Sequence, residues 1–255
     1  MGGTLTDDLG TPYRPARPPE RVVSLVPSLT EAVAASGPGL LVGATDWCTH
    51  PADLDVARVK GTKWPDLDRI ESLRPDLVLA NAEENRPEDI AALREQGIAV
   101  WVTAPATVPD ALASLGRMLA ALGTDDPGWL AEARRIWSGP APAPWCTAIV
   151  PIWRRPWMVL GRDTFAGDVL ARLGVANVYA GHAERYPRLD GPDAAGADLV
   201  VLPDEPYAFS ATDGPEAFPG LACALVSGRH LTWYGPSLVP ARALLADQLE
   251  QPRGP

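Results

Sequence analysis

The sequence has few cysteines, no excess of positive charge and no long hydrophobic run. Its 255 residues include three cysteines and three histidines, and the formal net charge is −10 at pH 7. A nucleic-acid-binding surface needs a basic stripe, so the acidic balance argues against nucleic acid as a partner. No apolar run reaches about 18 residues, the length that spans a bilayer, so we expect no transmembrane segment.

The three cysteines are Cys48, Cys146 and Cys223, which lie far apart and form no CxxC pattern. An odd number of widely spaced cysteines favours buried free thiols, as in a reducing compartment. One disulfide with one remaining thiol is the alternative.

Several motifs of catalysis are also missing. The sequence contains no GxSxG, HExxH, Walker or GxGxxG pattern, so we expect a protein that is not an enzyme. The first residues show no basic segment, apolar run or cleavage site of a secretory signal. As written, the chain is expected to be cytoplasmic, and to be extracytoplasmic if it is a trimmed mature form.

Proline and tryptophan are abundant, with 28 and nine residues. A proline-rich link over 138–144 is the best domain boundary, and the strand–helix–strand plan before it recurs after it. The pattern predicts an α/β fold of two Rossmann-like lobes. We expect a leader segment over 1–20 with Tyr13 as its only anchor, a first lobe over 21–105, a linking helical segment over 106–143 and a second lobe over 144–255.

The stretch from Gly61 to Arg86 organises the first lobe. Trp64 lies at the tip of a loop, Asp66 is placed to cap a helix that ends at Leu73, and a buried-type strand over 77–80 runs into the polar cluster 81–86. Ligands of open α/β sheets bind beyond the carboxyl ends of the strands. This stretch therefore predicts two walls of a binding site.

The remaining elements follow from hydrophobic periodicity. Ser28 or Thr30 is placed to cap the first helix. The predicted strands are 21–26, 40–44, 99–103, 147–152, 176–179, 198–202 and 222–226, the other helices are 31–36, 87–96, 107–122, 128–137, 164–173 and 237–249, and the second-lobe loops are 153–163, 180–193, 203–218 and 228–236.

Aromatic and charged side chains gather in the predicted loops. Aromatic residues around a cleft make an apolar pocket with polar rims. The alternatives are that the aromatics pack loops onto the sheet and that the arginines and acids pair with each other. The candidate ligand-binding residues are Trp47, Lys63, Trp64, Glu83, Glu84, Arg86, Trp153, Arg154, Trp157, Arg185, Tyr186, Tyr207, Trp233 and Tyr234.

Cys48 and His50 raise two further possibilities. They are potential metal ligands, although a structural role for His50 before Pro51 is favoured. A rival hypothesis is a cytoplasmic enzyme that uses Cys48, His50 and the pair Glu83–Glu84 on a small substrate. A reactive Cys48 would alkylate fast near neutral pH, whereas a packed thiol would not.

Two segments carry a family resemblance: RVVSLVPSLTE from Arg21 to Glu31, and LDRIESLRPDLV from Leu67 to Val78 after Trp64. The chain resembles the class III solute-binding proteins, the helical-backbone receptors for vitamin B12, haem and ferric siderophores, and is most similar to the cobalamin-binding type. The resemblance implies two α/β lobes joined by a long helix, with the ligand in the cleft between them. It also implies that Trp64 and Tyr186 line a corrin site and that Asp68 docks on a transporter permease.

The sequence departs from the family in three places. It lacks a leader, the linking helix is interrupted at 123–127, and the second docking acid has no clear counterpart, with Asp190 and Asp193 near it and Pro192 at its position. The chain looks more similar to a branch of these receptors that has no leader peptide and that shares Cys48 with His50, Lys63 and the runs 83–86, 153–158 and 185–187. We expect a monomeric binding protein with no intrinsic cofactor that takes a corrinoid. The alternative ligand is haem or a ferric siderophore, with His50 or Tyr207 as iron ligand.

Overall fold

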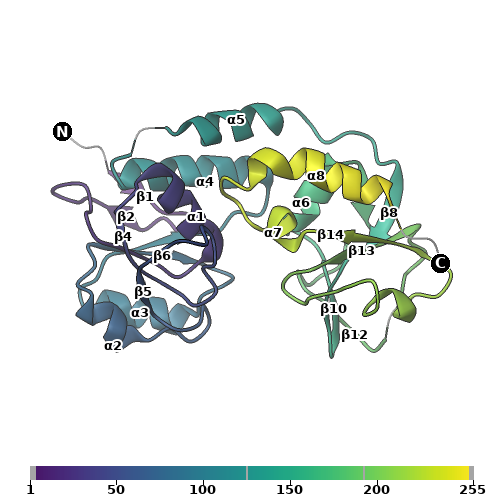
Figure 1. Ribbon diagram of the computed structural model, residues 1–255, viewed down its shortest axis with the longest axis horizontal. Coiled ribbons are helices and arrows are strands. Elements are labelled where there is room, and N and C mark those ends of the chain that lie inside the picture. The colour runs from purple at the N-terminus through teal and green to yellow at the C-terminus, as the bar shows by residue number, and fades with distance from the viewer. Residues whose placement is uncertain (1–3, 125, 192, 253–255) are drawn as a thin grey trace. The chain divides into compact units, whose positions relative to one another are not determined.

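The computed structural model describes residues 4–124, 126–191 and 193–252. The chain forms two compact units (Figure 1). Unit 1 contains Met1–Pro105, Asp110–Ala133 and Tyr234–Pro236, and unit 2 contains Ala106–Pro109, Arg134–Trp233 and Ser237–Pro255. Each unit is built on a parallel sheet with helices, which confirms the predicted α/β class.

The sheet of unit 1 is parallel and has five strands in the order β5-β4-β3-β6-β7. Every residue of β3 and β6 is buried, as expected for strands covered on both faces. The strands are β3 (Val22–Ser24), β4 (Leu41–Ala44), β5 (Ala57–Arg58), β6 (Leu77–Asn81) and β7 (Val100–Thr103).

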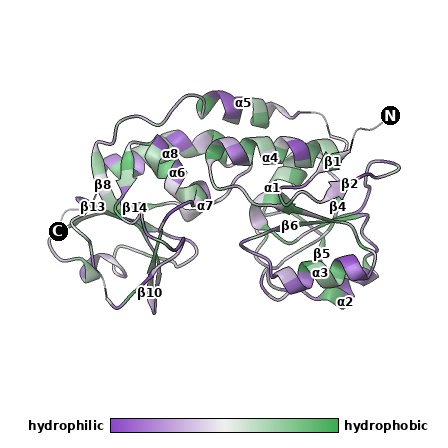
Figure 2. Cartoon of the chain, turned by 180° about the vertical axis from the view of Figure 1, so that it is seen from behind, coloured by the Kyte–Doolittle hydropathy of each residue, from purple (hydrophilic) through white to green (hydrophobic). Residues whose placement is uncertain are grey.

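Helices cover both faces of this sheet. In Figure 1, α2 (Leu67–Ser72) and α3 (Pro87–Glu95) lie together on one side and α1 (Pro27–Ser36) lies on the other. The amphipathic helix α4 (Val108–Ala121) confirms the prediction for 107–122, and Figure 2 shows its alternating hydrophobic and hydrophilic residues. The predicted interruption after it is also confirmed, because α5 spans Gly128–Ile136; Asp125 lies outside the described residues.

The start of α1 corrects the predicted cap. The helix begins at Pro27, after Val26, and neither Ser28 nor Thr30 caps it. Proline is favoured in the first turn because its missing N–H is not needed there. The Thr30 hydroxyl instead donates to the Val26 carbonyl over 3.0 Å.

The prediction that Tyr13 alone anchors the N-terminal segment is wrong. The segment forms a small hairpin of β1 (Leu5–Thr6) and β2 (Pro12–Tyr13). Between these strands, the buried Asp7 accepts the Val102 N–H at 3.2 Å and pairs with Arg94. Asp8 pairs with Arg117 at 2.6 Å. Two carboxylates therefore fasten the segment to β7, α3 and α4, which hydropathy alone did not indicate.

Unit 2 has a four-stranded parallel sheet in the order β11-β8-β13-β14 and a three-stranded antiparallel sheet in the order β12-β10-β9. Figure 1 shows α6, α7 and α8 on one side of the parallel sheet and β10 and β12 on the other. The strands are β8 (Cys146–Ile149), β9 (Pro151–Arg154), β10 (Trp157–Val159), β11 (Val175–Asn177), β12 (Arg188–Leu189), β13 (Leu199–Pro203) and β14 (Ala222–Val226), and the helices are α6 (Phe165–Arg172), α7 (Gly228–Thr232), α8 (Leu238–Glu250) and the 3-10 turn η1 (Pro215–Ala217).

All four predicted loops of unit 2 contain regular structure. The segment 180–193 contains β12, and the segment 203–218 contains η1. The segment 153–163 is largely the hairpin of β9 and β10, so Trp153 and Trp157 lie on strands. The segment 228–236 begins with α7. The hairpin was missed because prolines and arginines interrupt its alternation, and α7 because five residues are too few to show a period.

Candidate functional site

The carboxyl edge of the unit 1 sheet carries a buried polar cluster. The Asn81 amide donates to the Tyr234 hydroxyl at 2.7 Å, and the Thr103 hydroxyl lies 2.9 Å from the same oxygen. Burial raises the pKa of Tyr234, and the charge of Glu84 adds to this shift. Tyr234 therefore contributes a neutral, hydrogen-bonded phenol to this edge.

The polar loop predicted over 81–86 directly follows β6. The Asn81 side-chain oxygen accepts the N–H groups of Glu83 and Glu84 at 2.8 and 3.1 Å. Burial raises the pKa of Glu84 to about 7; the nearby Lys63 opposes the shift and Glu83 increases it. The turn after β6 thus holds a carboxyl group that titrates near neutral pH.

Two hydrogen bonds tie the Trp64 loop to this turn. Lys63 donates to the Glu83 carbonyl at 2.5 Å, and the buried Asn85 donates to the Thr62 carbonyl at 2.9 Å. The structure thus brings together the two walls predicted from the stretch 61–86.

Trp47 and Trp64 are the exposed aromatics of this edge, each with 67% of its surface accessible. The Arg86 guanidinium carbon lies 3.7 Å from the centre of the Trp64 ring, and Asp89 binds the same guanidinium. The two rings therefore give this edge exposed apolar surface.

The Cys48 thiol is buried, with its sulfur 3.0 and 3.1 Å from the hydroxyls of Thr30 and Thr45. Burial raises the pKa of Cys48. The His50 ring lies 3.2 Å from the Thr49 hydroxyl. Among the described residues, no group of three histidine, cysteine or acidic side chains is arranged to hold a metal ion. The free thiols predicted for Cys48, Cys146 and Cys223 are confirmed.

The aromatic residues of unit 2 divide into core and surface. Trp157 stacks on Phe209 with ring centres 6.2 Å apart and meets the edge of Phe218 at 5.5 Å. Trp153 is 42% exposed and meets the edge of Tyr207 at 5.6 Å. Trp153 therefore faces solvent, whereas Trp157 packs against the hydrophobic core.

Arg154 and Tyr207 already have partners within unit 2. The Arg154 guanidinium pairs with Asp213 and Glu216. The Tyr207 hydroxyl donates to Asp213 at 2.7 Å. This pairing agrees with the alternative that the arginines bind acids of the protein itself.

The carboxyl end of β13 repeats the acidic feature of β6. The buried Trp233 indole donates to Glu205 at 3.1 Å, and burial raises the pKa of Glu205. Gly228 packs tightly here, because an added Cβ would lie 2.4 Å from the Glu205 nitrogen. Arg185 donates to the Asp163 carbonyl, and Tyr186 is half-buried.

The candidate residues did not include Asp89, Glu205, Asp213 or Glu216. Asp89 was identifiable as a partner three positions after Arg86, and Glu205 from the repeat of an acid after a buried strand. The remaining two acids reach Arg154 through tertiary contacts that no local pattern indicates.

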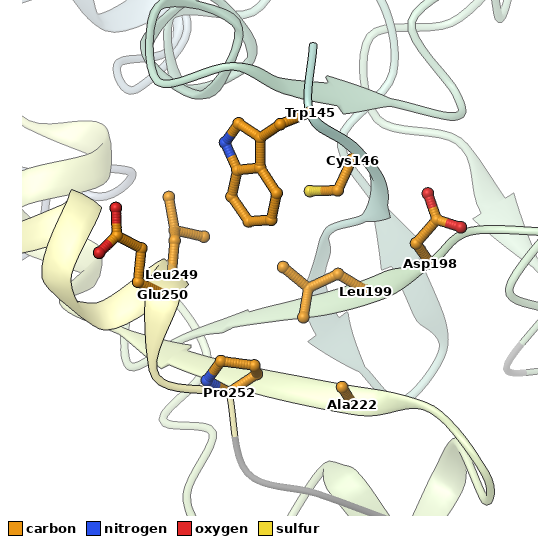
Figure 3. A pocket seen from close by; sticks show the side chains of 8 residues that line it. All are labelled: Trp145, Cys146, Asp198, Leu199, Ala222, Leu249, Glu250 and Pro252. Carbon is orange, nitrogen blue, oxygen red and sulfur yellow. The ribbon is translucent and has the colours of Figure 1, made fainter.

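A hollow of about 570 Å³ lies at the opposite edge of the unit 2 sheet (Figure 3). Its lining includes Cys146, Leu199 and Ala222, the first residues of β8, β13 and β14, and the exposed Trp145. It contains none of the candidate residues. Ligands of such sheets bind beyond the carboxyl ends, so the site is not assigned to this hollow.

The acids considered for docking are exposed. Asp68 lies in the first turn of α2, and Asp190 and Asp193 follow β12. Pro192 lies outside the described residues. In the described part of the chain, no helix is long and apolar enough to cross a membrane.

Comparison with known proteins places the chain among binding proteins. No protein-family model matches it. A vitamin B12-binding protein of Vibrio cholerae is 23% identical over 183 residues, which is 68% of this chain and 65% of that protein, so the chain spans less than two thirds of its length. A vitamin B12-binding protein of Pectobacterium carotovorum is 24% identical over 254 residues, covering 91% of this chain and 88% of the relative.

A solved structure matches a similar share of this chain. The periplasmic heme-binding protein BhuT, in complex with two hemes, is 25% identical, covers 90% of this chain and 97% of its own, and has a TM-score of 0.71. These similarities support the resemblance to the class III solute-binding proteins. Both of these similar proteins are named for binding rather than for catalysis.

Proposed function

We propose that this chain is the ligand-capturing protein of an ABC-type importer and that its ligand is a cobalamin-like corrinoid. The similarity to a vitamin B12-binding protein over 91% of the chain carries the proposal. The exposed tryptophans at the carboxyl edge of the unit 1 sheet support it.

Trp64 and Trp47 supply flat apolar surface in unit 1, and Trp153 supplies it in unit 2. Burying apolar surface contributes about 25 cal/mol per Å², so stacking on a macrocycle is a sufficient source of affinity. Lys63, Glu83, Arg185 and Tyr186 set orientation as polar contacts. Trp157, Trp233 and Tyr234 contribute to the fold of their own units rather than to the ligand surface, because each is packed or hydrogen-bonded there.

The protein acts by binding and not by catalysis. The buried Cys48, with its raised pKa, is a poor nucleophile at neutral pH. It works outside the cytoplasm as a monomer and requires no intrinsic cofactor. The exposed Asp68 contacts the permease.

A second candidate ligand is haem. The match to the heme-binding BhuT is as extensive as the matches to B12-binding proteins. The carboxylates of haem would suit a cationic partner, and Lys63 of unit 1 and Arg185 of unit 2 are each a candidate. Tyr207 is less suited to bind iron, because its hydroxyl already donates to Asp213.

Spectral and calorimetric titration with cyanocobalamin, cobinamide and haemin tests the proposal. Tight one-to-one binding of the two corrinoids, with haemin weaker, is the expected result. Preference for haemin would establish the second candidate. Binding of none of the three would contradict both and direct attention to a smaller ligand near Glu83 and Glu84.

A further inference from the structure

Arg86 lies against a buried carboxylate and an exposed tryptophan ring. Its Nε and Nη2 donate to the two carboxylate oxygens of Asp89 at 2.8 and 2.5 Å. The Asp89 side chain is only 6% exposed. The guanidinium carbon lies 3.7 Å from the centre of the Trp64 ring, the spacing of direct contact. A two-bond fork fixes the plane of the guanidinium, so it also fixes the surface presented to the ring.

The backbone reinforces this geometry. Arg86 precedes Pro87 and adopts an extended conformation, with φ −77° and ψ 136°, as residues before proline do. The Asp89 N–H donates to the Arg86 carbonyl at 3.1 Å. Both members of the pair therefore belong to one rigid start of α3.

The contacts that hold the Trp64 loop do not involve the Trp64 ring. Lys60 and Pro65 form an isolated bridge that closes the loop, and Lys60 pairs with Asp66 at 2.8 Å. The Trp64 ring nevertheless remains two-thirds exposed. The contact with Arg86 therefore leaves most of the ring open.

We propose that Arg86 and Asp89 are positioning residues, which hold the Trp64 ring so that its open face is ready for a planar ligand; this rests on the binding function proposed above. Arg86 then acts through Trp64 and is not itself a ligand contact. The positive guanidinium reduces the attraction of the ring for cations, so a neutral or anionic planar group suits the open face better. A ring ordered in advance loses less conformational freedom on binding.

The test compares Arg86→Lys and Asp89→Asn with the unchanged protein. Lysine keeps the charge but lacks the planar fork. Arg69→Lys, at an exposed position on α2, is the matched control. The indole Nε1–H signal of Trp64 in a ¹⁵N spectrum, assigned by its loss in Trp64→Phe, reports the ring before any ligand is added. Cyanocobalamin affinity is measured by calorimetry, and thermal unfolding verifies that each variant is folded.

Both variants are expected to shift the Trp64 signal and to weaken cyanocobalamin binding about threefold, while the control changes neither. An unchanged Trp64 signal in both folded variants would overturn the proposal, as would full affinity despite a shifted signal. If the unchanged protein binds no cyanocobalamin, the proposed function fails, and the Trp64 signal still decides whether the ring is positioned by Arg86.

Discussion

The Cys48 thiol lies beneath the surface of unit 1, against the hydroxyls of Thr30 and Thr45. Burial raises its pKa, so the reactive thiolate is scarce at neutral pH. With iodoacetamide at pH 7.5, we expect Cys48 to react more slowly than the half-buried Cys146, and far more slowly than a cysteine peptide. Peptide mapping by mass spectrometry measures both rates. Rapid selective labelling of Cys48 would support the rival hypothesis of an enzyme.

Glu84 makes stability depend on pH. Its carboxyl keeps a proton up to about pH 7 in the folded protein, because burial disfavours its charge, whereas the unfolded chain releases that proton near the ordinary glutamate pKa of 4.5. Stability is therefore unaffected by this group below pH 4 and falls as pH rises from about 4.5 to 7. The loss amounts to at most about 3 kcal/mol above pH 7.

Replacing Glu84 with glutamine removes this dependence. Urea midpoints at pH 5 and pH 8 should differ less in Glu84→Gln than in the unchanged protein. Glu95→Gln, exposed on α3, serves as the control and should keep the original difference. An identical pH dependence in all three proteins would show that Glu84 ionises normally.

At the scale of elements, the stability of α6 depends on its N-cap hydrogen bond. The buried Thr164 accepts the Gly167 N–H over 3.2 Å and caps the helix. Thr164→Ala should lower the free energy of unfolding by about 1 kcal/mol, because it leaves that N–H unsatisfied. Thr164→Ser retains the hydroxyl and should lose less. Equal losses in a urea denaturation series would assign the effect to the methyl group instead.

The β9–β10 hairpin presents two tryptophans in different roles. Trp157 packs on Phe209 and Phe218, so Trp157→Ala should cost about 3 kcal/mol of stability. Trp153 on the same hairpin is 42% exposed, so Trp153→Ala should cost less than about 1 kcal/mol. Denaturation of both variants measures the difference. Similar costs would place Trp153 in the core and remove it from the proposed ligand surface.

Elements with a strong local signal were predictable. The cap of α2 by Asp66, the buried strand β6 and the apolar stripe of α4 each follow from a few neighbouring residues. The hairpin β9–β10 and the contacts of Asp7 with Val102 and Arg94 were not predictable. The tertiary fold decides which strand a short strand pairs with. It also decides which N–H the Asp7 carboxylate binds, because that N–H lies 95 residues away in the sequence.

At the scale of the whole molecule, the two units repeat one plan. In each, a central buried strand ends near an acid whose pKa is raised by burial, Glu84 after β6 and Glu205 after β13. The sequence indicated this repeat through similar strands followed by acids. The types of residue at the candidate site were therefore predictable. Their exposure was not, because Trp64 and Trp233 look alike in a sequence, yet one is open and the other is hydrogen-bonded in the interior.

The calorimetric dissociation constant for cyanocobalamin, measured for the unchanged protein, Trp64→Ala and Trp145→Ala, tests the central claim most directly. Both tryptophans are exposed, but Trp145 lines the hollow at the amino edge of the unit 2 sheet. The account predicts one-to-one binding that Trp64→Ala weakens about tenfold or more and Trp145→Ala leaves unchanged. Binding that survives Trp64→Ala but not Trp145→Ala would contradict it.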